Sequence, residues 1–271
     1  MEAGQQIRDY VLDKLIGTGG AGQVWRAEHV HLEATAAIKA MHPHFSSNEE
    51  LRQRFLREAQ IMFRSNHDHL VPVHEFFFES GRYFIVMNYV GGGSLKDLIY
   101  KSGRLPLSDT FRIAREVLDA LNYAHETHHV IHRDVKPSNI LLGPEGRAYL
   151  GDFGMALATE RRRITVVGTQ GGGTPEYMSP EQVSGKPIDR RCNIYSFGVV
   201  LYEMLAGRLP FGSREEGTSD YTIMEGHKKR LPSPLDNRGV GAVTERVVLQ
   251  ALTKDPEDRF SSLCGHGGCA H

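Results

Sequence analysis

The chain has 271 residues, of which 40% are hydrophobic, enough to bury one large core or two lobes. A formal net charge of −1 provides no global field for nucleic acid or an anionic membrane surface, so partners of those kinds are not expected. Three cysteines cannot make a disulfide framework, which favours a reducing compartment, the cytoplasm.

The N-terminal region combines a predicted strand with a glycine-rich run. Tyr10–Ile16 has strand character, and Gly17–Val24 fits the pattern G-x-G-x-x-G-x-V. Glycines let a backbone approach phosphate oxygens closely and offer N–H donors to them. Val24–Glu28 alternates like a strand, which favours a hairpin lid over the helix that a dinucleotide-binding fold would place here. A hairpin without function remains the alternative for this run alone. No basic region followed by an apolar one precedes it, so we expect no secretory signal.

A lysine and a glutamate follow in two predicted elements. Lys39 ends an apolar strand, and a possible capping box of Ser47 and Glu50 opens a helix that runs to about Phe63. One face of this helix is apolar, formed by Leu51, Phe55, Ala59 and Met62. Glu58 falls inside this stripe, and a buried carboxylate needs a cation, for which Lys39 is the candidate. Alternatively, Glu58 lies solvated at the stripe's edge, and Lys39 extends its amine to solvent.

The next segments change from strands to helices. Leu70–Phe78 and Tyr83–Tyr89 are predicted strands, and the glycines after Val90 mark a domain boundary near residue 90. A helix follows, with one face expected to hold Phe111, Ala114, Leu118, Leu121 and His125.

A concentrated polar cluster lies within Val130–Leu142. Asp134, Lys136 and Asn139 place a carboxylate, a cation and an amide within six residues, between two apolar anchors. Asp152 stands further on, at a strand end beside a glycine. Mg²⁺ prefers few protein oxygens together with phosphate and water, and Asn139 with Asp152 fits that sparse set.

Taken in order, these motifs resemble one family. His132–Asn139 matches H-R-D-x-K-x-x-N, and Asp152–Gly154 matches D-F-G. With the glycine run, Lys39 and Glu58, they resemble the eukaryotic-type (Hanks-type) protein kinases over about residues 8 to 262. The lysine at 136 and the K-P-S-N variant are most similar to bacterial serine/threonine kinases.

The resemblance implies an α+β, two-lobe protein kinase fold. A small lobe of sheet with one helix is expected at about residues 8–87, a hinge at 88–91 and a mainly helical lobe at 92–262. Residues 263–271 are expected to form a disordered tail.

The resemblance also implies the reaction, transfer of the ATP γ-phosphoryl group to Ser or Thr hydroxyls of protein substrates. Asp134 would accept the hydroxyl proton, Lys136 would neutralise the γ-phosphate, and Asn139 with Asp152 would hold Mg²⁺, with Mn²⁺ as an alternative. Lys39, positioned by Glu58, would hold the α- and β-phosphates. The nucleotide-binding set would be Ile16, Gly17, Thr18, Gly19, Gly20, Ala21, Gly22, Gln23, Val24, Ala37, Lys39, the gatekeeper Met87, hinge residues Asn88 and Val90, and Leu141.

Further expectations concern Gly173–Glu181, which resembles the substrate-binding loop and the A-P-E element, with Ser179 in place of alanine. Glu181 would pair with Arg259. Thr165 or Thr169 in the preceding polar segment would carry a phosphate that pairs with Arg133, and self-association would allow autophosphorylation. Thr174 would support the substrate-binding loop.

Three further departures from the family pattern stand out. Asn193 replaces the usual aspartate, Val167-Gly168-Thr169 partly duplicates Gly173-Thr174, and the chain ends in CGHGGCAH where the family forms a last helix. The tail's Cys264, His266, Cys269 and His271 match no standard zinc spacing. A pseudokinase or nucleotide-binding scaffold, and a small-molecule phosphotransferase, are the rival interpretations. The intact polar set disfavours the first, and the substrate-loop motif disfavours the second.

Overall fold

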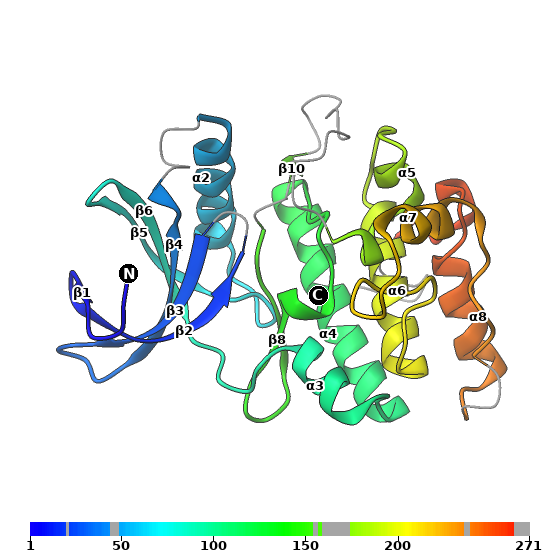
Figure 1. The fold of residues 1–271 in the computed structure, drawn as a ribbon, viewed down its shortest axis with the longest axis horizontal. Coiled ribbons are helices and arrows are strands. Elements are labelled where there is room, and N and C mark those ends of the chain that lie inside the picture. The colour runs from blue at the N-terminus through cyan, green and yellow to red at the C-terminus, as the bar shows by residue number, and fades with distance from the viewer. Residues whose placement is uncertain (20–21, 44–48, 154–156, 159–173, 236–238, 263–271) are drawn as a thin grey trace. The chain divides into compact units, whose positions relative to one another are not determined.

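The computed structural model describes residues 1–19, 22–43, 49–153, 157–158, 174–235 and 239–262, and the chain divides into two compact units. The first comprises Met1–Gly91 with Asp152–Met155, and the second comprises Gly92–Gly151 with Ala156–His271 (Figure 1).

The first unit is built on an antiparallel sheet of six strands in the order β1-β2-β3-β4-β6-β5. The strands are β1 (Gln6–Ile7), β2 (Tyr10–Thr18), β3 (Gly22–His29), β4 (Thr35–Met41), β5 (Val73–Glu79) and β6 (Arg82–Asn88). Trp25, Ile38 and Val86 lie in the core on one side of this sheet.

Helix α2 (Glu49–Arg64) accompanies the sheet and packs against β5. Phe55, Ala59 and Met62 are buried along it, as the apolar stripe predicts, and Glu58 is buried with them. The proposed capping box of Ser47 and Glu50 and the side chain of Leu51 lie outside the described residues.

The second unit is mainly helical. Its helices are α3 (Leu95–Ser102), α4 (Leu107–His128), α5 (Pro180–Val183), α6 (Arg191–Ala206), α7 (Asp220–Lys229) and α8 (Ala242–Ala251), with short turns η1 (Pro137–Asn139), η2 (Pro175–Tyr177) and η3 (Pro256–Asp258). Two small ladders join β7 (Val130–Ile131) to β10 (Leu157–Ala158) and β8 (Ile140–Leu142) to β9 (Ala148–Leu150). This composition confirms the predicted α+β kinase fold class.

Helix α6 forms the centre of the second unit's core. Most of the apolar run Ile194–Ala206 is buried, as predicted, and α6 packs against α4 and α8. None of the described helices combines the length and apolar character that a bilayer crossing needs.

The expected apolar face of α4 is partly wrong. Ala114 and Leu121 are buried, but Phe111 is 50% exposed, and the buried stripe runs instead through Ile113 and Val117. In a helix with a broad buried face, several overlapping series of residues are spaced three and four apart. Counting from the large aromatic Phe111 therefore selected a series that is not the buried one.

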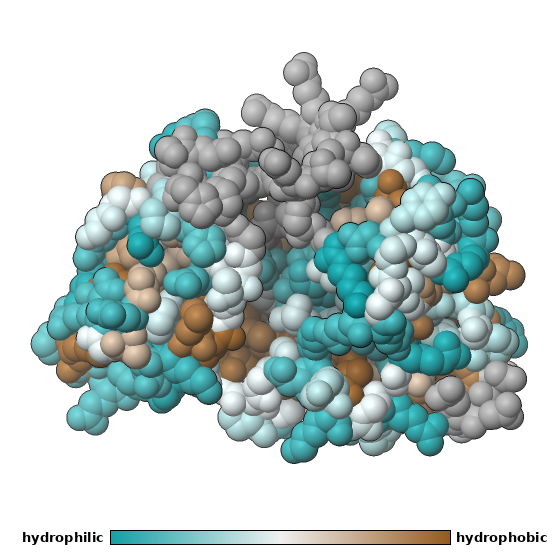
Figure 2. Space-filling view, viewed as in Figure 1, coloured by the Kyte–Doolittle hydropathy of each residue, from teal (hydrophilic) through white to brown (hydrophobic). Residues whose placement is uncertain are grey.

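In the view of Figure 2 hydrophobic residues reach the surface at separate places between hydrophilic ones.

Candidate active site

The glycine-rich run is the turn between β2 and β3. Ile16, Gly17 and Thr18 end β2, and the strands pair Gly17 with Val24 and Thr18 with Gln23. The Gly19 N–H donates to the Gly22 carbonyl at 2.9 Å, while Gly20 and Ala21 lie outside the described residues. The predicted hairpin is therefore present.

Glycine stands at two positions of this turn, 22 and 19, for different physical reasons. A Cβ at Gly22 would lie 2.0 Å from the Ala40 carbonyl oxygen, so the close approach of β4 requires glycine there. A Cβ at Gly19 would meet no atom of the described residues within 4 Å. The described residues therefore set no steric demand at Gly19, and open space beside a turn's backbone is what an approaching phosphate needs.

Lys39 on β4 lies between two carboxylates of the first unit. Its Nζ is 2.6 Å from Glu58 Oε1 and 3.0 Å from Asp152 Oδ1. The Glu58 side chain is 2% exposed and that of Asp152 is 48% exposed. Burial alone would lower the pKa of Lys39, but Asp152 and Glu58 outweigh it and raise the pKa, so the amine stays charged. Burial also raises the pKa of Glu58, and Lys39 opposes that shift.

The other predicted nucleotide contacts of the first unit follow the sheet register. Val24 pairs with Lys39 across β3 and β4, and Ala37 pairs with Met87 across β4 and β6. The Asn88 N–H donates to the Pro72 carbonyl at 3.0 Å. Val90 follows β6, and Leu141 lies on β8 of the second unit.

The polar cluster of the second unit converges on Asp134. Lys136 Nζ lies 2.7 Å from Asp134 Oδ2, and the two side chains are 17% and 16% exposed. Asn139 Nδ2 donates to the Asp134 carbonyl at 2.8 Å and to Asp134 Oδ2 at 3.1 Å. Lys136 also donates to Thr174 Oγ1 at 3.0 Å, which links the loop to the residue before η2.

Side chains from two helices hold the backbone of Arg133, the residue before Asp134. Its φ of 70° lies in the left-handed region, which a non-glycine residue adopts at a cost. The Arg133 N–H donates to Asn193 Oδ1 of α6 at 2.9 Å, and the Arg133 carbonyl accepts from Gln182 Nε2 of α5 at 2.9 Å. These contacts stabilise the backbone that aims Asp134.

The serine that departs from the A-P-E pattern explains how Gln182 is oriented. Ser179 and Gln182 form a capping box, in which Ser179 Oγ accepts from the Gln182 N–H and Gln182 Oε1 accepts from the Ser179 N–H. With its oxygen engaged, the Gln182 amide directs its nitrogen to Arg133. Sequence reasoning missed Gln182. The S-x-x-Q spacing of residues 179–182 is a signal that could have indicated the capping box, but it does not indicate the distant partner, Arg133.

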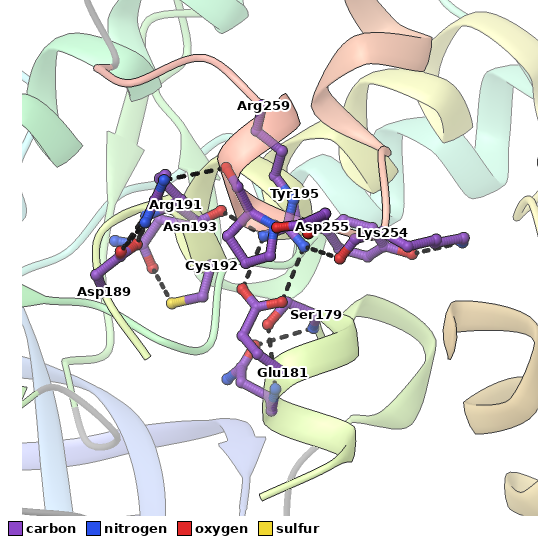
Figure 3. Close-up of polar contacts among 12 residues, drawn as sticks. Ser179, Glu181, Asp189, Arg191, Cys192, Asn193, Tyr195, Lys254, Asp255 and Arg259 are labelled. Carbon is purple, nitrogen blue, oxygen red and sulfur yellow. Dashed lines mark hydrogen bonds and ion pairs between the residues drawn. The ribbon is translucent and has the colours of Figure 1, made fainter. Parts of the chain in front are cut away.

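The predicted ion pair of Glu181 and Arg259 joins α5 to the residue after η3 (Figure 3). The Arg259 nitrogens Nη1 and Nη2 donate to the two Glu181 oxygens at 2.7 and 2.8 Å. Arg259 also donates to the carbonyls of Thr253, Arg191 and Lys254. A bidentate, fully hydrogen-bonded pair of this kind fixes the orientation of both elements.

Comparison with known proteins shows the family to which the chain belongs. The protein kinase domain family matches residues 10–266. The chain belongs to this family. Curated relatives are serine/threonine-protein kinases: PknH of Mycobacterium tuberculosis is 37% identical over 269 residues, 99% of this chain and 42% of PknH. PknA of Corynebacterium glutamicum is 37% identical over 257 residues, 93% of this chain and 53% of PknA. PknD of M. tuberculosis is 34% identical over 273 residues, 100% of this chain and 40% of PknD. The chain spans about half or less of these relatives' length.

Several predicted residues lie outside the described residues. They are Thr165, Thr169, the duplicated Val167–Thr169 and the tail residues Cys264, His266, Cys269 and His271. The phosphorylation of Thr165 or Thr169 stays a prediction.

Replacing Asn193 with aspartate is expected to raise both thermal stability and kcat while leaving nucleotide affinity nearly unchanged. A charged acceptor forms a stronger bond with the Arg133 N–H than an amide oxygen, by about 1–2 kcal/mol. Thermal melts and steady-state kinetics of Asn193→Asp measure the effect. A less stable or no faster variant would mean that burying the carboxylate, at a site only 1% exposed, costs more than the bond returns.

Proposed function

We propose that this chain is a serine/threonine protein kinase that transfers the γ-phosphoryl group of ATP to Ser and Thr hydroxyls of protein substrates. The observation that carries the proposal is the convergence of Lys136 and Asn139 on the partly exposed carboxylate of Asp134. The names of the relatives point to the same activity.

Asp134 would orient the acceptor hydroxyl and accept its proton. Asn139 donates to one carboxylate oxygen and to the Asp134 carbonyl, so the group is fixed in direction before a substrate arrives. The Lys136 amine forms an ion pair with the same carboxylate, and it would neutralise charge on the transferred group. Positioning and charge neutralisation together account for most of the catalysis in phosphoryl transfer.

The nucleotide would be bound through Lys39, the glycine turn and backbone groups of Asn88 and Val90. Since the Asn88 N–H already donates to Pro72, the Asn88 carbonyl is the group left for adenine. The Glu58 contact fixes the Lys39 amine, which would hold the α- and β-phosphates.

Mg²⁺, or Mn²⁺, would be held by Asn139 and Asp152. Asn139 directs its Nδ2 to Asp134, which leaves Oδ1 for a cation, and the Asp152 carboxylate is about half exposed. Few oxygen donors from the protein suit Mg²⁺, which keeps water and phosphate oxygens as its other ligands. When bound, the ion would neutralise phosphate charge.

The remaining proposals concern context. Because ATP is the donor and the described cysteine, Cys192, is a free thiol, we propose a cytoplasmic location for this domain. Protein substrates are the expected partners, and self-association would allow autophosphorylation.

Incubation with radiolabelled ATP, Mg²⁺ and myelin basic protein, followed by phosphoamino-acid analysis, tests the proposal. We expect label on serine or threonine. A bound but unhydrolysed nucleotide would favour a scaffold, and label on small molecules alone would favour a small-molecule phosphotransferase.

The Lys39 and Glu58 contact predicts coupled effects. Lys39→Ala and Glu58→Ala should each lower kcat/KM, and the double variant should lose less than the sum of the two losses, because the residues act as a unit. Kinetics of the four proteins measure the coupling, with Lys101→Ala on exposed α3 surface as control. Strict additivity would show that the contact does not serve catalysis.

A further inference from the structure

Arg133 and Asp134 carry four backbone polar groups, and a side chain binds each of them. Two of the groups are donors. The Arg133 N–H donates to Asn193 Oδ1 at 2.9 Å, and the Asp134 N–H donates to His132 Nδ1 at 3.3 Å. Because His132 Nδ1 accepts, the ring carries its proton on Nε2, which lies 3.0 Å from the Gly151 carbonyl oxygen. The ring is therefore fixed at both nitrogens.

The other two groups are carbonyls, which accept from side-chain amides. Asn139 Nδ2 donates to the Asp134 carbonyl at 2.8 Å, and Gln182 Nε2 donates to the Arg133 carbonyl at 2.9 Å. The Arg133 carbonyl and the Asp134 N–H belong to the same planar peptide group. Gln182 and His132 therefore hold the two ends of the peptide plane that leads into Asp134.

The conformation of Arg133 gives the Gln182 contact its importance. Arg133 has a φ of 70°, in the left-handed region that costs free energy for a residue other than glycine, so surrounding contacts must hold it. Gln182 reaches it from α5, 49 residues further along the chain. Without this donor the strained backbone would be freer to relax, and the direction of the Asp134 side chain would change with it.

The capping box of α5 decides which end of the Gln182 amide faces Arg133. The Ser179 N–H can only donate, and it binds Gln182 Oε1 at 3.0 Å. The Arg133 carbonyl can only accept, so it takes the Nε2 end. A flipped amide would lose both bonds. The amide thus has two separable roles, because its oxygen caps α5 while its nitrogen holds the loop that carries Asp134.

We propose that Gln182 is a positioning residue whose Nε2–H holds the peptide plane before Asp134, and so sets the direction of the Asp134 carboxylate toward the acceptor hydroxyl. This inference rests on the proposed kinase function. It gives α5 a part in aiming the base, besides its part in the ion pair of Glu181 and Arg259.

Two substitutions separate the role of the amide nitrogen from that of the oxygen. Gln182→Glu keeps an oxygen acceptor for the Ser179 N–H, as in the capping box S-x-x-E, but has no N–H to donate. Gln182→Lys has donors for the Arg133 carbonyl but no acceptor for the capping box. If Gln182 only capped α5, Gln182→Lys would be the more damaging change.

With myelin basic protein as substrate, we expect Gln182→Glu to lower kcat about 3- to 10-fold, the scale of one neutral hydrogen bond. Gln182→Lys should retain more of the wild-type kcat than Gln182→Glu, although the capping box is lost. The KM for ATP should stay unchanged in both, since Lys39, the residue proposed to hold the phosphates, is fixed by Glu58 and Asp152. Gln250→Glu, the same change at an exposed position of α8, is the matched control.

The inference is overturned if Gln182→Glu keeps the wild-type kcat, if Gln182→Lys is as slow as Gln182→Glu or slower, or if the KM for ATP rises as kcat falls. Should either variant fail to fold, Gln182→Met takes its place, because it has a similar length and neither a donor nor a charge. A wild-type kcat in Gln182→Met would equally overturn the inference, and a lower kcat at unchanged KM for ATP would support it. If the wild type transfers no phosphate to protein, it is the proposed function that fails.

Discussion

Replacing Asp134 with asparagine is expected to lower phosphoryl transfer to protein by at least about 10²-fold, the scale of a general base. Asparagine keeps the shape of the side chain and its contact with Asn139, but it cannot accept the hydroxyl proton. Nucleotide affinity should remain, because we propose that Asp134 faces the acceptor hydroxyl, while Lys39, which Glu58 and Asp152 hold, is the residue proposed to bind the phosphates.

Titration with a fluorescent ATP analogue and initial-rate kinetics separate these two effects. Asp68→Asn, an exposed aspartate in the turn before β5, is the matched control and should behave as wild type. Near-normal turnover of Asp134→Asn would contradict the assignment of Asp134.

Replacing Arg259 with alanine is expected to have the largest effect on stability, a loss of about 3–5 kcal/mol. The Arg259 side chain is 0% exposed, and its removal leaves the Glu181 carboxylate, 5% exposed, buried without its cation. Three backbone carbonyls lose a donor at the same time, and the Tyr195 ring loses the guanidinium that lies 4.8 Å from its centroid.

Urea denaturation measures this loss, provided that the unfolding free energy depends on urea concentration with the same slope in both proteins. Arg64→Ala, at the exposed end of α2, should change stability by less than about 0.5 kcal/mol, as most surface substitutions do. Removing both partners in Glu181→Ala/Arg259→Ala should cost less than the two single losses together, because no charge is then left unpaired. A loss below 1 kcal/mol in Arg259→Ala would mean that water replaces the pair.

The sequence predicted features that depend on local pattern. The period of α2 was enough to place Glu58 on a buried face and to require a cation, and Lys39 is that cation. The pair of Glu181 and Arg259 was expected from the resemblance to the protein kinases. The first case needs only residue type and spacing, whereas the second needs the family.

Partners set by tertiary packing could not be predicted in this way. Gln182 meets the Arg133 carbonyl from 49 residues away, and His227 meets Tyr195 from 32 residues away. Each contact depends on how α5, α6 and α7 pack. The phase of α4 was set wrongly at Phe111 for a related reason: hydrophobicity alone does not tell which of several overlapping faces meets the core.

The pseudokinase interpretation is disfavoured by the described site and by the relatives. Lys39, Glu58, Asp134, Asn139 and Asp152 are all present and in contact with polar partners. Asn193 still accepts from the Arg133 N–H, so this departure weakens one contact without removing it. We therefore expect Asn193 to reduce the rate of catalysis without abolishing it.

The central claim is that this chain transfers phosphate from ATP to protein hydroxyls with Asp134 as base. Counting ADP and protein-bound phosphate in the same reaction tests it most directly, with wild type and Asp134→Asn side by side. We expect one phosphoserine or phosphothreonine for each ADP in the wild type, and both products lowered together in the variant. ADP formed without protein phosphate, or phosphate carried on tyrosine alone, would contradict the claim.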